Sequence, residues 1–177
     1  MIGVLVSGEG TNLQALIDAG LPIAAVASNR ADAPALERAD RALIPNRVYA
    51  LDDFADRDAR DHEMADWLQL RGVDLVVLAG YMQLLTPLFL ERFPQRIVNV
   101  HPSLLPDFPG PRPIEDALAA GVETTGVTVH YVDEGIDTGP VIRQESVVVE
   151  PRDTLLSRIH AVEHRLLPQV VRELCAR

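Results

Sequence analysis

The sequence predicts an α/β fold: a doubly wound, mostly parallel sheet flanked by helices, with an antiparallel strand pair near the C-terminal end. In the first part of the chain, short apolar runs alternate with segments of helical periodicity. One run, residues 74–78 (Asp-Leu-Val-Val-Leu), is typical of a central parallel strand buried on both faces. Near the C-terminal end, two extended segments enclose a tight acidic turn, which indicates a hairpin.

The periodicity places the elements of the first part in order. Strands are expected at residues 2–7, 23–28, 47–50, 74–78 and 97–101, and helices at 13–17, 33–41, 57–71 and from 87. In the helix at 57–71, Met64, Trp67 and Leu68 form an apolar stripe. The acids and arginines of this helix are interpreted as a solvated face, although Arg57 could reach a site from the first turn.

Between the first strand and the first helix lies a glycine turn, Gly8-Glu9-Gly10-Thr11-Asn12, in which Thr11 or Asn12 can cap the helix. Glycines let a backbone approach an anion closely, and the free N–H groups of a helix start point toward it. A phosphate site is therefore one interpretation. An ordinary strand-to-helix turn is the other, because the spacing is not the Gly-x-Gly-x-x-Gly of dinucleotide sites.

The second part is expected to be mixed. After a proline-rich loop at 102–113, the pattern predicts a helix at 114–120, hairpin strands at 126–132 and 141–149, and an amphipathic helix from about 154 to 175. Thr128 and His130 share one face of the first hairpin strand. His160, Glu163 and His164 of the last helix are most simply interpreted as a charged surface.

The composition restricts the function. At 177 residues, the chain is expected to form one domain, residues 1–177, with a substantial core. Neither a signal peptide nor a membrane-spanning run is evident, so we expect a cytoplasmic protein without a membrane partner. The net charge of −10 argues against a nucleic-acid partner. A single cysteine excludes a multi-thiolate metal site, and the lack of lysine excludes a Schiff-base or P-loop lysine.

The most informative stretch is Asn99-Val100-His101-Pro102, where Asn99 and His101 would point to the same face of a strand end. A turn-forming Asn and a satisfied His are the simplest interpretation. With Asp137 from the acidic turn, however, the two residues make a coherent set. The amide can donate to a developing oxyanion, the histidine suits acid–base catalysis, and the carboxylate can hold the imidazole. Since no serine–histidine pair is evident, the set suits acyl transfer to an amine without a covalent enzyme intermediate.

Ligands of doubly wound sheets bind at the carboxyl ends of the strands, so residues 8–12, 80–85 and 99–101 are expected on one rim. Specific motifs lie there: Ser-Gly-Glu-Gly-Thr-Asn-Leu-Gln-Ala at 7–15, Ala-Gly-Tyr-Met at 79–82 and Asn-Val-His-Pro-Ser-Leu-Leu-Pro at 99–106, with a later Asp-Thr-Gly-Pro at 137–140. Through these motifs the chain resembles, over nearly its whole length, the folate-dependent formyltransferases, and among them the phosphoribosylglycinamide formyltransferases.

The resemblance implies an enzyme with a Rossmann-like formyltransferase fold. It would transfer the formyl group of 10-formyltetrahydrofolate to the amine of glycinamide ribonucleotide in de novo purine biosynthesis. It implies small-molecule substrates, no metal, and a monomer or homodimer.

The resemblance also implies site residues. Asn99, His101 and Asp137 would be catalytic. The substrate phosphate would bind Gly10, Thr11 and Asn12, and the rest of the ribonucleotide would contact His160 and Glu163. The folate would bind Arg57, Met82, Gln83, Leu84, Leu85, Asn99, Asp133, Glu134, Gly135, Ile136 and Asp137.

The chain departs from the family pattern in three places. Gln83 stands where many relatives carry Arg, Glu9 replaces a common Asn, and the loop at 110–114 lacks a histidine often found there. Pro113-Ile114 before a helix is similar to methionyl-tRNA formyltransferases, which are the main alternative. We expect the ribonucleotide to be the acceptor. The tRNA enzymes have a further RNA-binding domain and formyltetrahydrofolate deformylases have an N-terminal regulatory domain, and neither domain is expected in this sequence. A non-enzymatic remnant of the fold would be expected to have lost part of the catalytic set, which is complete here.

Overall fold

The structure, a computed structural model, describes residues 1–176. The chain divides into two compact units, Met1–Val98 and Asn99–Arg177, and the boundary falls within strand β5 (Ile97–His101). The single domain expected over residues 1–177 stays a prediction.

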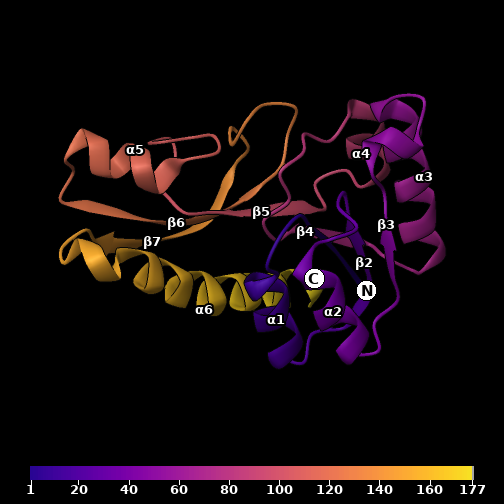
Figure 1. Cartoon of the computed structure of the whole chain (residues 1–177), viewed down its shortest axis with the longest axis horizontal. Coiled ribbons are helices and arrows are strands. Elements are labelled where there is room, and N and C mark those ends of the chain that lie inside the picture. The colour runs from indigo at the N-terminus through magenta and orange to yellow at the C-terminus, as the bar shows by residue number, and fades with distance from the viewer. Residues whose placement is uncertain (177) are drawn as a thin grey trace. The chain divides into compact units, whose positions relative to one another are not determined.

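The first unit contains a parallel sheet with the strand order β3-β2-β1-β4. Its strands are β1 (Ile2–Val6), β2 (Ile23–Ser28), β3 (Asn46–Val48) and β4 (Leu75–Leu78). Its helices are α1 (Thr11–Asp18), α2 (Pro34–Arg41), the 3-10 helix η1 (Leu51–Asp53), α3 (Arg57–Leu70) and α4 (Pro87–Arg92). Helices α1 and α2 lie on one face of the sheet, and α3 and α4 lie on the other (Figure 1). The predicted parallel, doubly wound arrangement is confirmed for this unit.

The core of the first unit forms because its central strands are apolar throughout. Every residue of β1 and β4 is buried, as expected for parallel strands covered by helices on both faces. Met64 and Leu68 of the predicted stripe on α3 are also fully buried. This packing fixes the carboxyl ends of the strands, from which the candidate site loops emerge.

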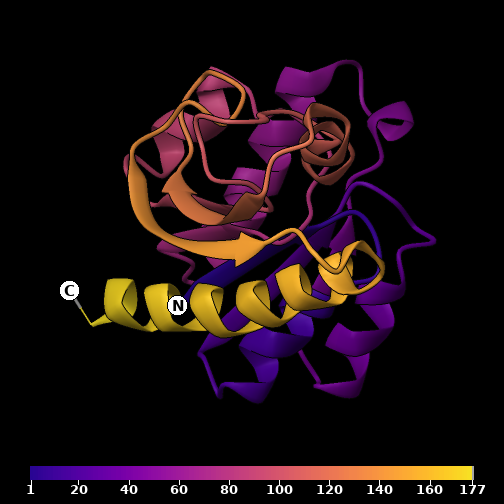
Figure 2. The ribbon, with the colours of Figure 1, turned by 90° about the vertical axis from the view of Figure 1, so that its left-hand side faces the viewer.

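The second unit has the strand order β5-β6-β7. Strands β6 (Thr124–Tyr131) and β7 (Val141–Val148) pair antiparallel, with Thr124 opposite Val148, so the predicted hairpin is confirmed. The helices of this unit are α5 (Pro113–Ala120), the 3-10 helix η2 (Arg152–Thr154) and α6 (Leu155–Cys175). Helix α6 packs along β6 and β7, while α5 lies on the other side of the hairpin (Figures 1 and 2).

The start of α1 differs from the prediction. The N-cap is Gly10, in the left-handed conformation with φ of 72°, and no side chain caps the helix. The expectation that Thr11 or Asn12 caps it is wrong, because both residues already lie in the first turn. Glycine takes the cap position since its left-handed backbone lets the chain turn sharply from β1 into α1.

The prediction of a solvated charged face is wrong for two residues of α3. Arg60 and Asp61 are fully buried, and Arg60 Nη2 lies 2.7 Å from Asp61 Oδ1. The charged-surface interpretation is also wrong for Glu163 on α6, which is 5% exposed. A periodic pattern cannot show that a neighbouring segment covers a charged side chain. Within residues 1–176, no helix combines the length and the apolar character needed to cross a bilayer.

Candidate active site

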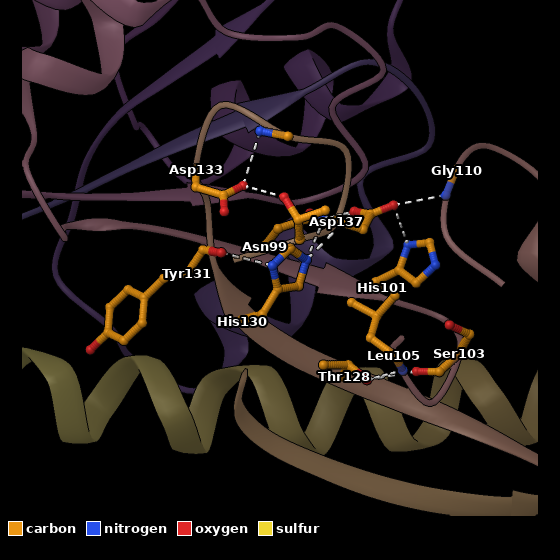
Figure 3. A network of polar contacts seen from close by, with 12 residues as sticks. Asn99, His101, Ser103, Leu105, Gly110, Thr128, His130, Tyr131, Asp133 and Asp137 are labelled. Atoms are coloured by element: carbon orange, nitrogen blue, oxygen red, sulfur yellow. Dashed lines mark hydrogen bonds and ion pairs between the residues drawn. The ribbon is translucent and has the colours of Figure 1, made fainter. Parts of the chain in front are cut away.

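Three polar side chains of the second unit meet at the carboxylate of a fourth residue, Asp137. Asn99 and His101 extend from β5, His130 from β6, and Asp137 from the turn that joins β6 to β7. Figure 3 shows the first three pointing toward Asp137. Asn99 Nδ2 lies 3.4 Å from Asp137 Oδ1, and His101 Nδ1 lies 3.4 Å from Asp137 Oδ2. The structure therefore brings together the predicted set of Asn99, His101 and Asp137.

The environment of Asp137 favours its charged form. Burial alone would raise its pKa. A hydrogen bond with His130, the Gly110 N–H at 2.9 Å and the charges of both histidines outweigh burial and hold the pKa of this carboxyl below its usual value of 3.8. Near neutral pH, Asp137 is therefore a carboxylate that accepts hydrogen bonds.

Both ring nitrogens of His101 face acceptors. Nε2 lies 2.9 Å from the carbonyl oxygen of Phe108, and Nδ1 faces Asp137. Only an imidazolium carries an N–H on each nitrogen and can donate to both partners at once. The Phe108 carbonyl thus orients His101, and the Gly110 N–H orients Asp137.

His130 is a site residue that the sequence analysis did not assign. Its Nδ1 lies 2.8 Å from the Tyr131 carbonyl oxygen, which can only accept, so Nδ1 carries a proton. Nε2 lies 3.3 Å from Asn99 Nδ2 and 3.6 Å from Asp137 Oδ1, so it accepts from the Asn99 amide when the ring is neutral and donates to Asp137 when the ring is charged. His130 is 2% exposed. Its signal in the sequence is the same as that of Asn99: a polar side chain in a strand that is otherwise buried.

The turn that carries Asp137 is braced internally. Asp133 Oδ1 accepts the Gly135 N–H at 3.0 Å and the Thr138 hydroxyl at 2.7 Å. Asp137 itself has a φ of 55°, a left-handed conformation that non-glycine residues rarely adopt. A Cβ added to Gly139 would lie 1.9 Å from the Tyr131 carbonyl oxygen, so this end of the turn packs directly on β6. These contacts fix the direction of the Asp137 side chain.

The rest of the predicted folate residues in this turn are exposed. Asp133, Glu134 and Gly135 face solvent, and Ile136 is 53% exposed. An apolar side chain thus stands on the surface beside the buried carboxylate network. Such a surface suits a flat, partly apolar ligand.

In the first unit, the glycine turn after β1 is closely packed. The Ala35 N–H donates to the Gly8 carbonyl at 3.1 Å, and a Cβ on Gly10 would lie 2.5 Å from the Ala35 Cβ. Gly10, Thr11 and Asn12 stand together at the N-terminal end of α1. Asn12 is 9% exposed, and its Oδ1 has no hydrogen-bond partner within residues 1–176.

Arg38 supplies positive charge beside this turn. Its Nε donates to the Glu9 carbonyl at 2.7 Å, and its Nη1 lies 3.3 Å from Gln14 Oε1. The Glu9 side chain itself is exposed. The sequence analysis did not single out Arg38, because it lies on the next helix and only the fold brings it to the turn.

The predicted folate loop of the first unit lies between β4 and α4, outside any helix or strand. Met82 and Leu84 are 67% and 51% exposed, and Gln83 and Leu85 are half-buried. Arg57 Nη2 donates to the Leu84 carbonyl at 2.7 Å, so the structure brings these two predicted residues together. The backbone N–H and C=O groups of Gln83 and Leu85 have no partner among the described residues.

His160 and Glu163, the predicted ribonucleotide residues, are one turn apart on α6. Glu163 is buried, whereas His160 is half-buried and its ring stacks on His164 at 5.9 Å between centroids. In the described part of the chain, no group of three or more His, Cys, Asp or Glu side chains is placed to hold a metal ion.

The sequence of this chain is similar to those of known formyl transferases. The formyl transferase family model matches residues 1–171. A phosphoribosylglycinamide formyltransferase from Haemophilus influenzae is 43% identical over 97% of this chain and 85% of its own length.

Solved structures show the same likeness. The crystal structure of glycinamide ribonucleotide transformylase 1 from Symbiobacterium toebii has a TM-score of 0.94 and 48% identity, and covers 97% of this chain and 85% of that one. The corresponding Geobacillus kaustophilus structure has a TM-score of 0.94 and 46% identity, and covers 98% and 97%. These likenesses confirm the predicted α/β fold class with its mostly parallel sheet.

Proposed function

The chain belongs to the formyl transferase family, and from this premise we propose that it transfers a formyl group from 10-formyltetrahydrofolate to the amine of phosphoribosylglycinamide, releasing tetrahydrofolate. The relatives described above are named for this acceptor, and the step belongs to purine biosynthesis. The observation that carries the proposal within this chain is the convergence of Asn99, His101 and His130 on the Asp137 carboxylate.

The formyl folate supplies an activated formyl group attached through nitrogen. Asn99 donates to the formyl oxygen, where negative charge develops as the amine attacks. The present acceptors of its amide lie at 3.3 and 3.4 Å, at the long end of the hydrogen-bond range, so an N–H can be redirected to the substrate. The imidazolium of His101 stabilises the same charge.

Asp137 acts on His101 and on the proton balance. Its carboxylate keeps an acceptor beside Nδ1 of His101 and so orients the ring. As the new carbon–nitrogen bond forms and the bond to the folate nitrogen breaks, one proton leaves the incoming amine and one is needed on the departing nitrogen. A carboxylate at this position can accept and return that proton, directly or through water.

The remaining site residues are proposed as binding groups. The N–H groups of Gly10, Thr11 and Asn12 hold the substrate phosphate, and His160 and Glu163 contact the rest of the ribonucleotide. The folate lies on Arg57, Met82, Gln83, Leu84, Leu85, Asn99 and residues 133–137. Free backbone groups at Gln83 and Leu85, next to the exposed side chains of Met82 and Leu84, fit a heterocycle with polar edges and apolar faces.

The test is a formyl-transfer assay with 10-formyltetrahydrofolate and three acceptors: phosphoribosylglycinamide, charged initiator tRNA and water. We expect turnover with phosphoribosylglycinamide alone. Turnover only with the tRNA would point to the methionyl-tRNA enzymes, and hydrolysis alone to a deformylase. A cytoplasmic location, a monomeric or homodimeric state and the absence of nucleic-acid and membrane partners stay predictions.

A further inference from the structure

The segment at residues 82–86 is fixed at alternate residues. The Met82 N–H donates to Ser7 Oγ at 2.8 Å, the Leu84 carbonyl accepts from Arg57 Nη2 at 2.7 Å, and the Thr86 N–H donates to Asp61 Oδ2 at 2.7 Å. The intervening residues, Gln83 and Leu85, keep their backbone groups free among the described residues. The anchors therefore determine where these free groups stand.

The hydrogen bond that fixes Thr86 is unusual because its acceptor, Asp61, is a fully buried charged residue. Asp61 and Arg60 are both 0% exposed, and Arg60 Nε donates to Asp61 Oδ1 at 2.8 Å. Burying an ion pair costs desolvation free energy that the attraction between the charges repays only in part. Here the second carboxylate oxygen is occupied by one backbone N–H, that of Thr86.

The buried polar groups at and near the pair have few hydrogen-bond partners. Arg60 Nη1, the Tyr81 hydroxyl and the Thr86 hydroxyl have no hydrogen-bond partner within residues 1–176. Burial raises the pKa of Tyr81 to about 12, so this hydroxyl stays neutral beside the pair. A carboxylate in such surroundings binds its few donors tightly, since water does not compete for them.

We propose that Asp61, held in place by Arg60, is a positioning residue of the folate site: its carboxylate fixes the Thr86 end of segment 82–86 and so sets the spacing of the free backbone groups of Gln83 and Leu85. This role rests on the proposed function, because it assumes that segment 82–86 binds the formyl folate. Asp61 itself does not touch the ligand.

Two double variants separate the hydrogen bond from the ion pair. Arg60→Met/Asp61→Leu removes both charges and the acceptor but keeps the volume of the core. Arg60→Met/Asp61→Asn also removes both charges but keeps an amide oxygen for the Thr86 N–H. Asp66→Asn is the matched control, because it breaks the 2.6 Å pair with Arg92 that joins α3 to α4 outside this segment.

The readouts are the KM values for both substrates and hydrogen exchange of the Thr86 amide in the ligand-free chain. We expect the Met/Leu variant to raise the KM for 10-formyltetrahydrofolate roughly 5- to 100-fold, the range for a buried N–H that loses its acceptor. Its KM for phosphoribosylglycinamide should be unchanged, and Thr86 should exchange faster. The Met/Asn variant and Asp66→Asn should resemble the wild type in both readouts.

The outcomes are distinguishable. A Met/Leu variant with a wild-type folate KM, or with both KM values raised alike, would overturn the positioning role while leaving the transferase intact. A wild-type chain that protects the Thr86 amide but transfers no formyl group would instead contradict the proposed function, and the positioning role with it.

Discussion

Asp137 Oδ2 lies 3.4 Å from Nδ1 of His101 and accepts the Gly110 N–H at 2.9 Å. One carboxylate oxygen therefore meets two N–H groups of different kinds, a titratable ring and a backbone amide. The backbone amide cannot leave when the ring changes its protonation state. In the proposed reaction, Asp137 would thus stay in position if His101 gained or lost a proton.

The lowered pKa of Asp137 predicts a pH-dependent contribution to stability. Because the folded protein binds this proton less tightly than the unfolded chain, the free energy of unfolding rises with pH through the region below and around 3.8. Above that region, the contribution of Asp137 is fully present, and it is lost as the pH falls through the folded-state pKa. The free energies of unfolding in urea of the wild type and Asp137→Asn should therefore diverge as the pH rises through this region. Above the region, the two should differ by a constant amount. A constant difference at every pH would show that the pKa of Asp137 is not lowered. Glu115→Gln, at an exposed site on α5, is the control for removing one negative charge.

Asn99 and Asp137 are expected to act as a unit in catalysis. Losing one oxyanion donor typically lowers kcat by about 10²–10³, and groups that act together give non-additive losses. Asn99→Ala and Asp137→Ala should each depress kcat strongly with modest changes in KM. The double variant should lose less than the product of the two single effects. Multiplicative losses in steady-state kinetics would mean that the two side chains act independently.

His130 is expected to position Asn99 through the acceptor at Nε2. His130→Gln can place an amide oxygen near Nε2, whereas His130→Asn can replace only the donor at Nδ1. We expect His130→Asn to lower kcat roughly tenfold, the equivalent of one lost hydrogen bond, with His130→Gln closer to the wild type. The KM for phosphoribosylglycinamide should stay the same in both. Equal kcat values for the two variants would argue against this role.

Gly10 and Gly8 offer a matched pair in the glycine turn. A Cβ at Gly10 would clash with Ala35 and occupy a left-handed conformation, whereas a Cβ at Gly8 meets nothing within 4 Å. Gly10→Ala should therefore raise the KM for phosphoribosylglycinamide much more than the KM for the folate, and lower the melting temperature. Gly8→Ala should change neither KM. A Gly10→Ala enzyme in which both KM values rise together would place the phosphate elsewhere.

The sequence was sufficient for the elements whose burial is uniform or strictly alternating. The apolar run at 74–78 and the hairpin around the acidic turn were predicted within one or two residues of β4, β6 and β7. The spacing of Asn99 and His101 also predicted that both side chains leave the same face of β5, where the structure places them beside Asp137. These features depend on side-chain period, which a single sequence displays directly.

Features that depend on contacts between distant segments were not predictable. Arg60 and Asp61 have the polarity of a solvated face but are interior residues, and Asp61 accepts a hydrogen bond from Thr86, 25 residues further along the chain. Arg38 belongs to another helix than the turn it supports. His130 was visible as a polar residue in a buried strand, but its partner at Asn99 lies in a different strand.

Two peptide groups, the Phe108 carbonyl and the Gly110 N–H, orient the proposed catalytic residues His101 and Asp137. Side-chain replacement at Phe108 leaves its carbonyl in place, and alanine at Gly110 would also strain a backbone with a φ of 95°, so an alanine scan cannot isolate the contribution of these peptide groups. Chemistry on the main chain can reach them. Replacing the residue 110 amide with an ester by semisynthesis deletes the Gly110 backbone N–H that donates to Asp137, and this would reveal how far the orientation of the Asp137 carboxylate depends on the backbone.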